Sequence, residues 1–152
     1  MCHFQWQMKR ALGIDLGDVR VGVAISDELK FLAHPLETID VRKTAALPRI
    51  CELVAARDVD AIVVGLPRNM DGSRGPAAEK ATKFTDELRA ALAGKDVQII
   101  SLDERLTTVS AQRSLREAGR KAHEQKSIID QAAAQVILQS WLDAQAGGLS
   151  AL

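Results

Sequence analysis

Three acidic side chains occupy positions in the sequence from which carboxylates could do chemistry. Asp15 lies inside the apolar segment GIDLG, Glu104 closely follows the apolar run VQIISL, and Asp130 lies near the start of a helical pattern of apolar residues. Gly13 and Gly17 flank Asp15 and would let a ligand or another backbone approach closely. Because an unpartnered buried carboxylate is costly or has a shifted pKa, Asp15 should have a compensating partner. We expect that partner to be a metal ion.

Carboxylates from separate segments favour hard divalent cations. Mg²⁺ and Mn²⁺ prefer oxygen ligands and leave coordination positions open for water and phosphate. In a two-metal arrangement one ion activates the attacking water and the other stabilises the leaving oxygen, so no histidine base or nucleophilic side chain is needed. His3, His34 and His123 are scattered along the chain, which suggests neither a zinc cluster nor a catalytic triad. The three carboxylates therefore predict metal-dependent phosphodiester chemistry.

Each acidic residue also has a purely structural interpretation. Asp15 could accept local backbone N–H bonds at a hairpin, and acids that precede a helix are favoured by the helix dipole. Asp130 lies three residues after Ser127, which is the spacing of a helix capping box. Of the neighbours Asp103 and Glu104 we favour Glu104 for the site, because adjacent side chains at a strand end point to opposite sides.

A glycine-rich loop and several basic residues could hold the phosphates of a substrate. The loop over 66–76 follows a predicted strand and precedes a predicted helix, a position where backbone N–H groups can bind phosphate. It lacks the Lys-Ser/Thr of a P-loop, so an ordinary connection stays open. Between 105 and 126 there are six basic and two acidic side chains, which form either a basic patch or a solvated helix face. The residues that we expect to contact substrate are Arg20, Arg68, Arg74, Arg105, Thr107, Arg113, Lys121 and Lys126.

The spacing of apolar residues predicts the elements that must position these side chains. Two apolar strands flank Gly17-Asp18 as a hairpin, and the next extended segment contains Pro35, which favours an edge of the sheet. Helical and strand patterns then alternate. The predicted strands are 11–16, 20–26, 31–39, 61–66 and 97–102, and the predicted helices are 44–57, 81–92, 107–118 and one that begins at Ser127. This order predicts an α/β fold in which helices flank a five-stranded mixed sheet, with three antiparallel strands followed by parallel ones.

Length and composition bound the class of protein. A chain of 152 residues with 47% hydrophobic content can bury one core, so we expect one domain over 10–145, a flexible extension over 1–9 and a tail over 146–152. Twenty basic and twenty acidic side chains cancel, so any nucleic-acid footprint must be local. No apolar run is long enough to span a membrane and the first residues lack the apolar stretch of a signal peptide. We therefore expect a cytoplasmic protein.

Four blocks of this sequence closely resemble the YqgF/RuvX family. The blocks are GIDLGDVRVGVAISD, GLPRNMDGSRGPAA, SLDERLTT and IIDQAAAQVILQSWLD, and they occur in the order found in the family. The resemblance implies an RNase H-like fold related to the RuvC resolvases. It also carries the acidic positions of the family onto Asp15, Glu104 and Asp130.

The same resemblance implies two kinds of substrate. The family is linked to maturation of the 5′ end of 16S rRNA and, in some members, to the cutting of branched DNA. Such a protein would bind pre-rRNA or a four-way Holliday junction and could meet ribosomal particles. On a junction with two-fold symmetry it would be expected to act as a homodimer.

Two other functions stay open at the level of sequence. GIDLG also resembles the first phosphate loop of the actin and sugar-kinase ATPases, although those enzymes usually need two such domains to enclose ATP. A non-catalytic RNA- or ribosome-binding module would keep the fold without the cleavage. The absence of Tyr and an aromatic content of 3% disfavour stacking on single-stranded bases, so contacts should be mainly to backbone and shape.

Overall fold

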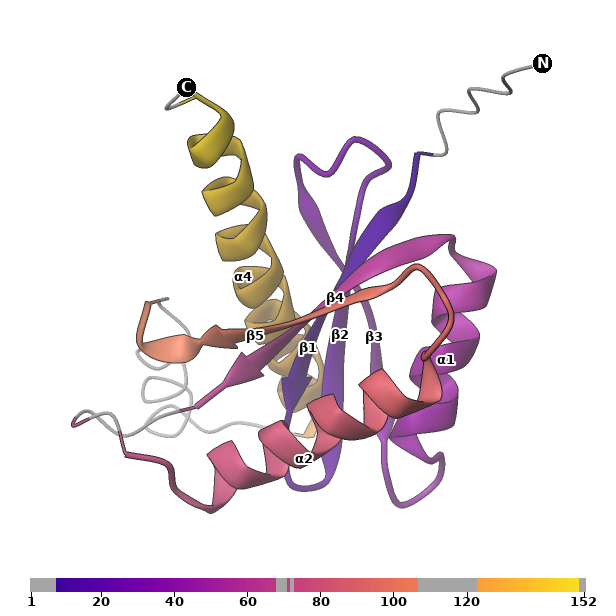
Figure 1. Ribbon diagram of the computed structural model, residues 1–152. Coiled ribbons are helices and arrows are strands. Elements are labelled where there is room, and N and C mark those ends of the chain that lie inside the picture. The colour runs from indigo at the N-terminus through magenta and orange to yellow at the C-terminus, as the bar shows by residue number, and fades with distance from the viewer. Residues whose placement is uncertain (1–7, 68–70, 72, 107–122, 151–152) are drawn as a thin grey trace.

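The computed structural model describes residues 8–67, 71, 73–106 and 123–150, which form one sheet with helices on both faces (Figure 1). The strands are β1 (Arg10–Leu16), β2 (Arg20–Ser26), β3 (Ala33–Asp40), β4 (Val59–Leu66) and β5 (Gln98–Asp103). The helices are α1 (Ala46–Ala56), α2 (Pro76–Ala91) and α4 (His123–Ser150), and a 3-10 turn over Glu104–Leu106 follows β5. The helix predicted over 107–118 lies outside the described residues.

The sheet is mixed, as the sequence predicts. Its strand order is β3-β2-β1-β4-β5, in which β2 pairs antiparallel with both β1 and β3 and β4 pairs parallel with both β1 and β5. Pro35 lies in β3 at the edge of the sheet, opposite Ala24, where the register with β2 shifts by a bulge. The predicted edge position is therefore confirmed, and an edge strand is where a proline, which has no backbone N–H, is tolerated.

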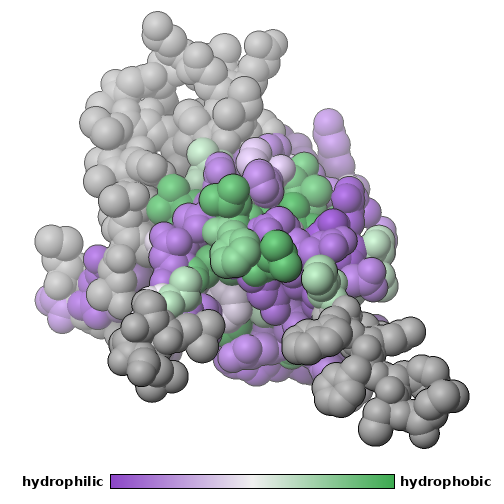
Figure 2. Space-filling model, turned by 90° about the horizontal axis from the view of Figure 1, so that it is seen from above, coloured by the Kyte–Doolittle hydropathy of each residue, from purple (hydrophilic) through white to green (hydrophobic). Residues whose placement is uncertain are grey.

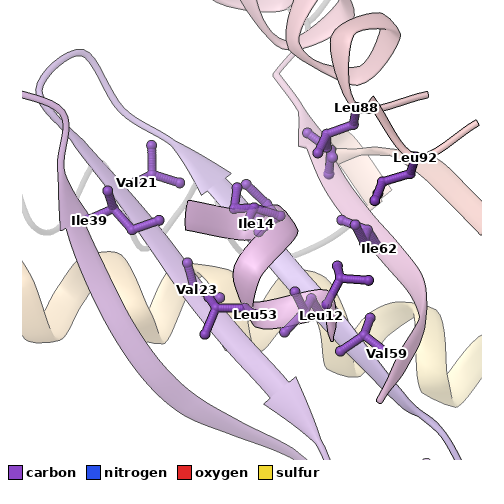
Figure 3. Close-up of a cluster of buried hydrophobic side chains, with 13 residues drawn as sticks. Leu12, Ile14, Val21, Val23, Ile39, Leu53, Val59, Ile62, Leu88 and Leu92 are labelled. Atoms are coloured by element: carbon purple, nitrogen blue, oxygen red, sulfur yellow. The ribbon is translucent and has the colours of Figure 1, made fainter. Parts of the chain in front are cut away.

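One face of the sheet packs against α1 and α2 through large apolar side chains (Figure 3). Residues that alternate along β1 and β2 point to this face, as the period of a strand requires. The buried members of this cluster are Leu12, Ile14, Val21, Val23, Ile39, Ile50, Leu53, Val54, Val59, Ile62, Val64, Leu88 and Leu92.

The other face carries α4 and is built from smaller residues. Ala11, Ala24, Ala33 and Ala61 supply the sheet side of this second cluster, together with Val63. Between them, a Cβ atom on Gly13 would lie 2.6 Å from the backbone oxygen of Ala134 in α4. The prediction that Gly13 admits another backbone is confirmed, and the small side chains let α4 lie close to the sheet.

Both ends of α4 differ from the prediction. The helix begins at His123, so Ser127 lies inside it and the capping-box interpretation of Asp130 is wrong. Glu124, Gln125 and Lys126 are good helix formers, which explains the earlier start. At the other end the helix continues to Ser150, into the stretch predicted to be a tail.

Three glutamines, one helical turn apart, attach α4 to the edge strand. Gln135 Nε2 donates to the backbone oxygen of Ala33 at 2.9 Å, and the Ala33 N–H donates to Gln139 Oε1 at 2.8 Å. Gln131 Nε2 donates to the hydroxyl of Thr38 at 3.1 Å. The polar groups of β3 are thus bonded from the helix side.

The connection between β2 and β3 exposes apolar groups. Phe31 is 64% exposed, and Leu29 and Leu32 are each 58% exposed. Figure 2 looks onto the molecule from above and shows hydrophobic residues among hydrophilic ones. No helix in the described part of the chain is long and apolar enough to cross a membrane.

Candidate active site

Asp15 lies near the carboxyl end of β1, the strand in the middle of the sheet. Leu12 and Ile14 belong to the cluster under α1 and α2, so Gly13 and Asp15 face α4. Only 3% of Asp15 is exposed. Its partner on β2 is Gly22, with which it pairs in the antiparallel register.

Gly22 is the point at which α4 reaches the sheet. A Cβ atom on this glycine would lie 2.0 Å from the backbone oxygen of Asp130 and 3.2 Å from its Cβ atom. Real Cβ atoms do not approach so closely, so only glycine fits under the helix here. Asp130 therefore lies over the strand position next to Asp15.

Gly65, on the other side of Asp15, leaves room for the side chain of Glu104. Ile14 pairs with Val64 in the parallel register, so Gly65 is the β4 residue beside Asp15. A Cβ atom on Gly65 would lie 2.6 Å from Glu104 Oε1. Burial raises the pKa of Glu104 to about 7, with a smaller contribution from the charge of Asp103, and the residue is 2% exposed.

The three predicted acids thus converge on one row across the sheet. The row runs Gly22, Asp15, Gly65 over neighbouring strands that lie about 4.8 Å apart. Asp130 lies over one glycine of the row and Glu104 over the other. We call Asp15, Glu104 and Asp130 the carboxylate set.

The carboxylate set does not form a preassembled metal cluster. Among the residues that the structure describes, no group of three or more His, Cys, Asp or Glu side chains could hold a metal ion. Asp130 is engaged by a cation of the protein itself, because Arg20 Nε donates to its Oδ2 at 3.2 Å. Arg20 therefore occupies one oxygen of a carboxylate that the set would offer to a metal ion.

The chemistry of these donors still suits a hard cation. All three side chains offer carboxylate oxygens, which Mg²⁺ and Mn²⁺ prefer. Glu104 has a buried carboxyl whose charge is disfavoured, and a nearby cation would offset that cost. The residues present therefore fit a divalent metal site.

Asp103, which we did not choose as a site residue, is paired with Arg105. Its carboxylate accepts bonds from Arg105 Nη2 at 2.7 Å and from the Arg105 backbone N–H at 2.9 Å. The structure therefore separates the two adjacent acids, with Glu104 buried against Gly65 and Asp103 paired with Arg105. The guanidinium of Arg105, predicted to contact substrate, is occupied by this ion pair.

The remaining predicted substrate contacts are described only in part. Arg74 is exposed in the connection that leads into α2, where the Ser73 N–H donates to Asp71 Oδ1 at 2.8 Å. Arg68, Thr107, Arg113 and Lys121 lie outside the described residues, as does the side chain of Lys126.

Sequence analysis missed Gly22, Gly65 and Lys80. Lys80 Nζ donates to the backbone oxygen of Gly17 at 2.7 Å and so brings a positive charge of α2 to the turn between β1 and β2. The two glycines had a detectable signal, because each interrupts a strand of apolar residues where glycine otherwise weakens a sheet. Lys80 had none, because only the tertiary structure places it there.

Comparison with known proteins identifies the family. The model of the RuvX family, described as Holliday junction resolvase, matches residues 9–144. This chain belongs to that family. A relative from Acetivibrio thermocellus is 47% identical over 90% of this chain and 96% of its own length, and one from Mycobacterium ulcerans is 50% identical over 88% and 78%. Both relatives are named as candidate pre-16S rRNA nucleases.

Solved structures show the fold of this RuvX family member to be that of RuvC. Thermus thermophilus RuvC, solved in complex with a Holliday junction substrate, matches with a TM-score of 0.54 and 16% identity over 91% of this chain and 96% of its own. A second structure of the same enzyme matches with a TM-score of 0.53. The predicted RNase H-like fold is therefore confirmed.

Proposed function

We propose that this protein is a cytoplasmic, divalent-metal-dependent endonuclease that hydrolyses phosphodiester bonds in structured nucleic acid. The carboxylate set would hold Mg²⁺ or Mn²⁺. The observation that carries the proposal is the row across the sheet, in which two glycines bring Glu104 and Asp130 to either side of the buried Asp15. Local backbone bonds to Asp15 or a capping box at Asp130 would not require the three acids to converge.

The residues of the site have separate tasks. When bound, a divalent ion activates water for attack and stabilises charge on the leaving oxygen. Asp15 lies on a central strand whose neighbours on both sides hold it in place, so it provides the fixed ligand. Arg20 and the exposed Arg74 can offer guanidinium groups to phosphates. We keep Arg68, Arg105, Thr107, Arg113, Lys121 and Lys126 as further proposed contacts for substrate.

Two substrates are proposed from the comparisons. The relatives named for pre-16S rRNA point to its 5′ end, and the family described as Holliday junction resolvase points to branched DNA. On pre-rRNA the protein would also meet ribosomal particles. On a junction the two-fold symmetry of the substrate calls for a homodimer.

Cleavage of labelled structured RNA and of a four-way DNA junction tests the proposal. Wild type should cut at least one substrate with Mg²⁺ or Mn²⁺ and neither in EDTA. Asp15→Asn and Glu104→Gln should each lower the rate by at least about a hundredfold, the scale on which loss of one transition-state contact is felt. Asp18→Asn, in the exposed turn after Asp15, is a matched control that should cut normally.

The other outcomes are equally informative. Cutting that persists in both variants would place the activity at another site or in a contaminant. Binding of RNA without any cutting by wild type would favour the non-catalytic RNA- or ribosome-binding module.

A further inference from the structure

Arg20 is a cation in direct contact with a member of the carboxylate set. It is the first residue of β2 and precedes Gly22 by two positions, so both residues face α4. Its Nε donates to Asp130 Oδ2 at 3.2 Å, and the two side chains are 25% and 14% exposed. A guanidinium is thus bonded to a carboxylate that the proposed function assigns to a metal ion.

The geometry of this pair differs from that of the two-point arginine pairs in the described part of the chain. Arg105 binds Asp103 side-on through Nε and Nη2, and Arg49 binds Glu37 in the same way. Arg20 uses Nε alone, and within the described part of the chain this is the one hydrogen bond of its side chain. Both Nη groups of Arg20 therefore have donors to offer to a second anion.

A guanidinium and a divalent cation compete for one carboxylate. Arg20 compensates the charge of Asp130 when no metal is bound, and its own positive charge repels an incoming cation at short range. A phosphate group accepts paired N–H bonds from a guanidinium and is the natural second anion for the Nη groups. Phosphate bound there would draw Arg20 away from Asp130 or divide its charge between the two anions.

We infer that Arg20 is a positioning residue that makes metal binding and nucleic-acid binding cooperative. This inference rests on the proposed function. In the free protein Arg20 holds Asp130 and keeps the affinity for a divalent ion low. Nucleic acid occupies Arg20 through a phosphate and releases Asp130 to the metal. By linkage, the metal raises the affinity for nucleic acid by the same factor.

Mn²⁺ binding without nucleic acid tests the competition directly. Titration followed by the electron paramagnetic resonance signal of free Mn²⁺ should show about tenfold tighter binding by Arg20→Gln than by wild type, a coupling of ordinary size. Arg10→Gln is the matched control, because Arg10 also begins a strand and pairs with a carboxylate, Glu28, at 3.3 Å. Its Mn²⁺ affinity should equal that of wild type.

Nucleic-acid binding without metal tests the phosphate contact. In EDTA, the anisotropy of a labelled four-way junction should show several-fold weaker binding by Arg20→Gln than by wild type and by Arg10→Gln. Circular dichroism melting of every variant verifies the fold. If Arg20→Gln does not fold, Arg20→Met retains the apolar stem and repeats both titrations without the charge.

Failure of this inference and failure of the proposed function give different results. Mn²⁺ binding that Asp15→Asn abolishes but Arg20→Gln leaves unchanged or weakens would overturn the competition and keep the metal site. Mn²⁺ binding that Asp15→Asn leaves unchanged would overturn the metal site itself, and the role of Arg20 with it.

Discussion

The two faces of the sheet are built from side chains of different size and hold their helices at different distances. Towards α1 and α2 the strands present leucine, isoleucine and valine, which fill the space between sheet and helices. Towards α4 the strands present mainly alanine and glycine. The backbone of α4 lies directly against the strands at Gly13 and Gly22. The first face separates sheet and helix by side chains, while the second brings them together.

This difference explains how three acids from distant parts of the chain converge. A helix that lay on leucines would hold Asp130 a full side-chain length above Asp15. Because Gly22 and Gly65 have no side chains, Asp130 and Glu104 occupy the space that those side chains would fill. Large side chains on one face therefore fill an apolar core, and their absence at the glycines of the other face lets the carboxylate set converge.

The largest effect is expected at Gly22. In Gly22→Val the new side chain would overlap the backbone of Asp130, so α4 must shift and the carboxylate set must separate. Overpacking of this kind costs about 3 kcal/mol or more of the free energy of unfolding. Cleavage should fall to background even at temperatures where circular dichroism shows a folded protein. Normal cleavage by this variant would mean that α4 need not touch β2.

The second-largest effect is expected on stability alone, and it tests whether the two faces of the sheet act independently. Leu12 is fully buried on the α1 and α2 side of β1, and Leu12→Ala should lower the free energy of unfolding by about 2–5 kcal/mol. Below its melting temperature this variant should cut nucleic acid at nearly the wild-type rate. Urea unfolding and a cleavage assay at low temperature measure the two quantities. A loss of cleavage with the fold intact would show that the two faces are coupled.

The third effect concerns the charge buried on the α4 face. The pKa of Glu104 is raised from 4.5 to about 7 in the folded protein. The protonated form is therefore the stable one, and its contribution to stability, complete below about pH 4.5, is lost as the pH rises through 7. In EDTA at pH 8, Glu104→Gln should melt about 5 °C above wild type, and the difference should vanish near pH 4.5.

Two controls sharpen that measurement. Glu87→Gln, on the exposed side of α2, corrects for the loss of one negative charge. Mg²⁺ should raise the melting temperature of wild type more than that of Glu104→Gln. Equal melting temperatures of wild type and Glu104→Gln at pH 8 in EDTA would mean that the Glu104 carboxylate is already compensated within the protein.

The smallest effect is expected at the glutamines that attach α4 to β3. Gln135→Ala removes the bond to the backbone oxygen of Ala33 and should cost about 1 kcal/mol of the free energy of unfolding. Cleavage should be unchanged, because this contact lies away from the carboxylate set. A large loss of cleavage would indicate that the glutamines, rather than the glycines, fix the position of α4.

The sequence was sufficient for the sheet but not for the geometry of the site. Strands β1, β2 and β4 consist of apolar residues bounded by turns, and such local patterns identify strands without tertiary information. The acids were recognised because charge is unexpected in such segments. Their convergence depends on the register of β1 against β2 and β4, which the sequence of a single strand does not specify.

The errors and omissions have the same origin. The Ser127 capping box was a sound local pattern, but the residues before it also form helix and α4 starts at His123. The pairing of Arg20 with Asp130 joins residues at opposite ends of the chain, and no local pattern relates them. Interactions within a few residues were predictable, whereas those that define the site are long-range.

The positions of the carboxylate set in the chain also bear on the order in which the protein is made. Asp15 is in the first strand and Asp130 is in α4, the last element of the chain. Synthesis proceeds from the N-terminus, so a growing chain has Asp15 and Glu104 long before Asp130 leaves the ribosome. In the proposed nuclease the carboxylate set is therefore complete only after α4 has been synthesised and has docked on the sheet.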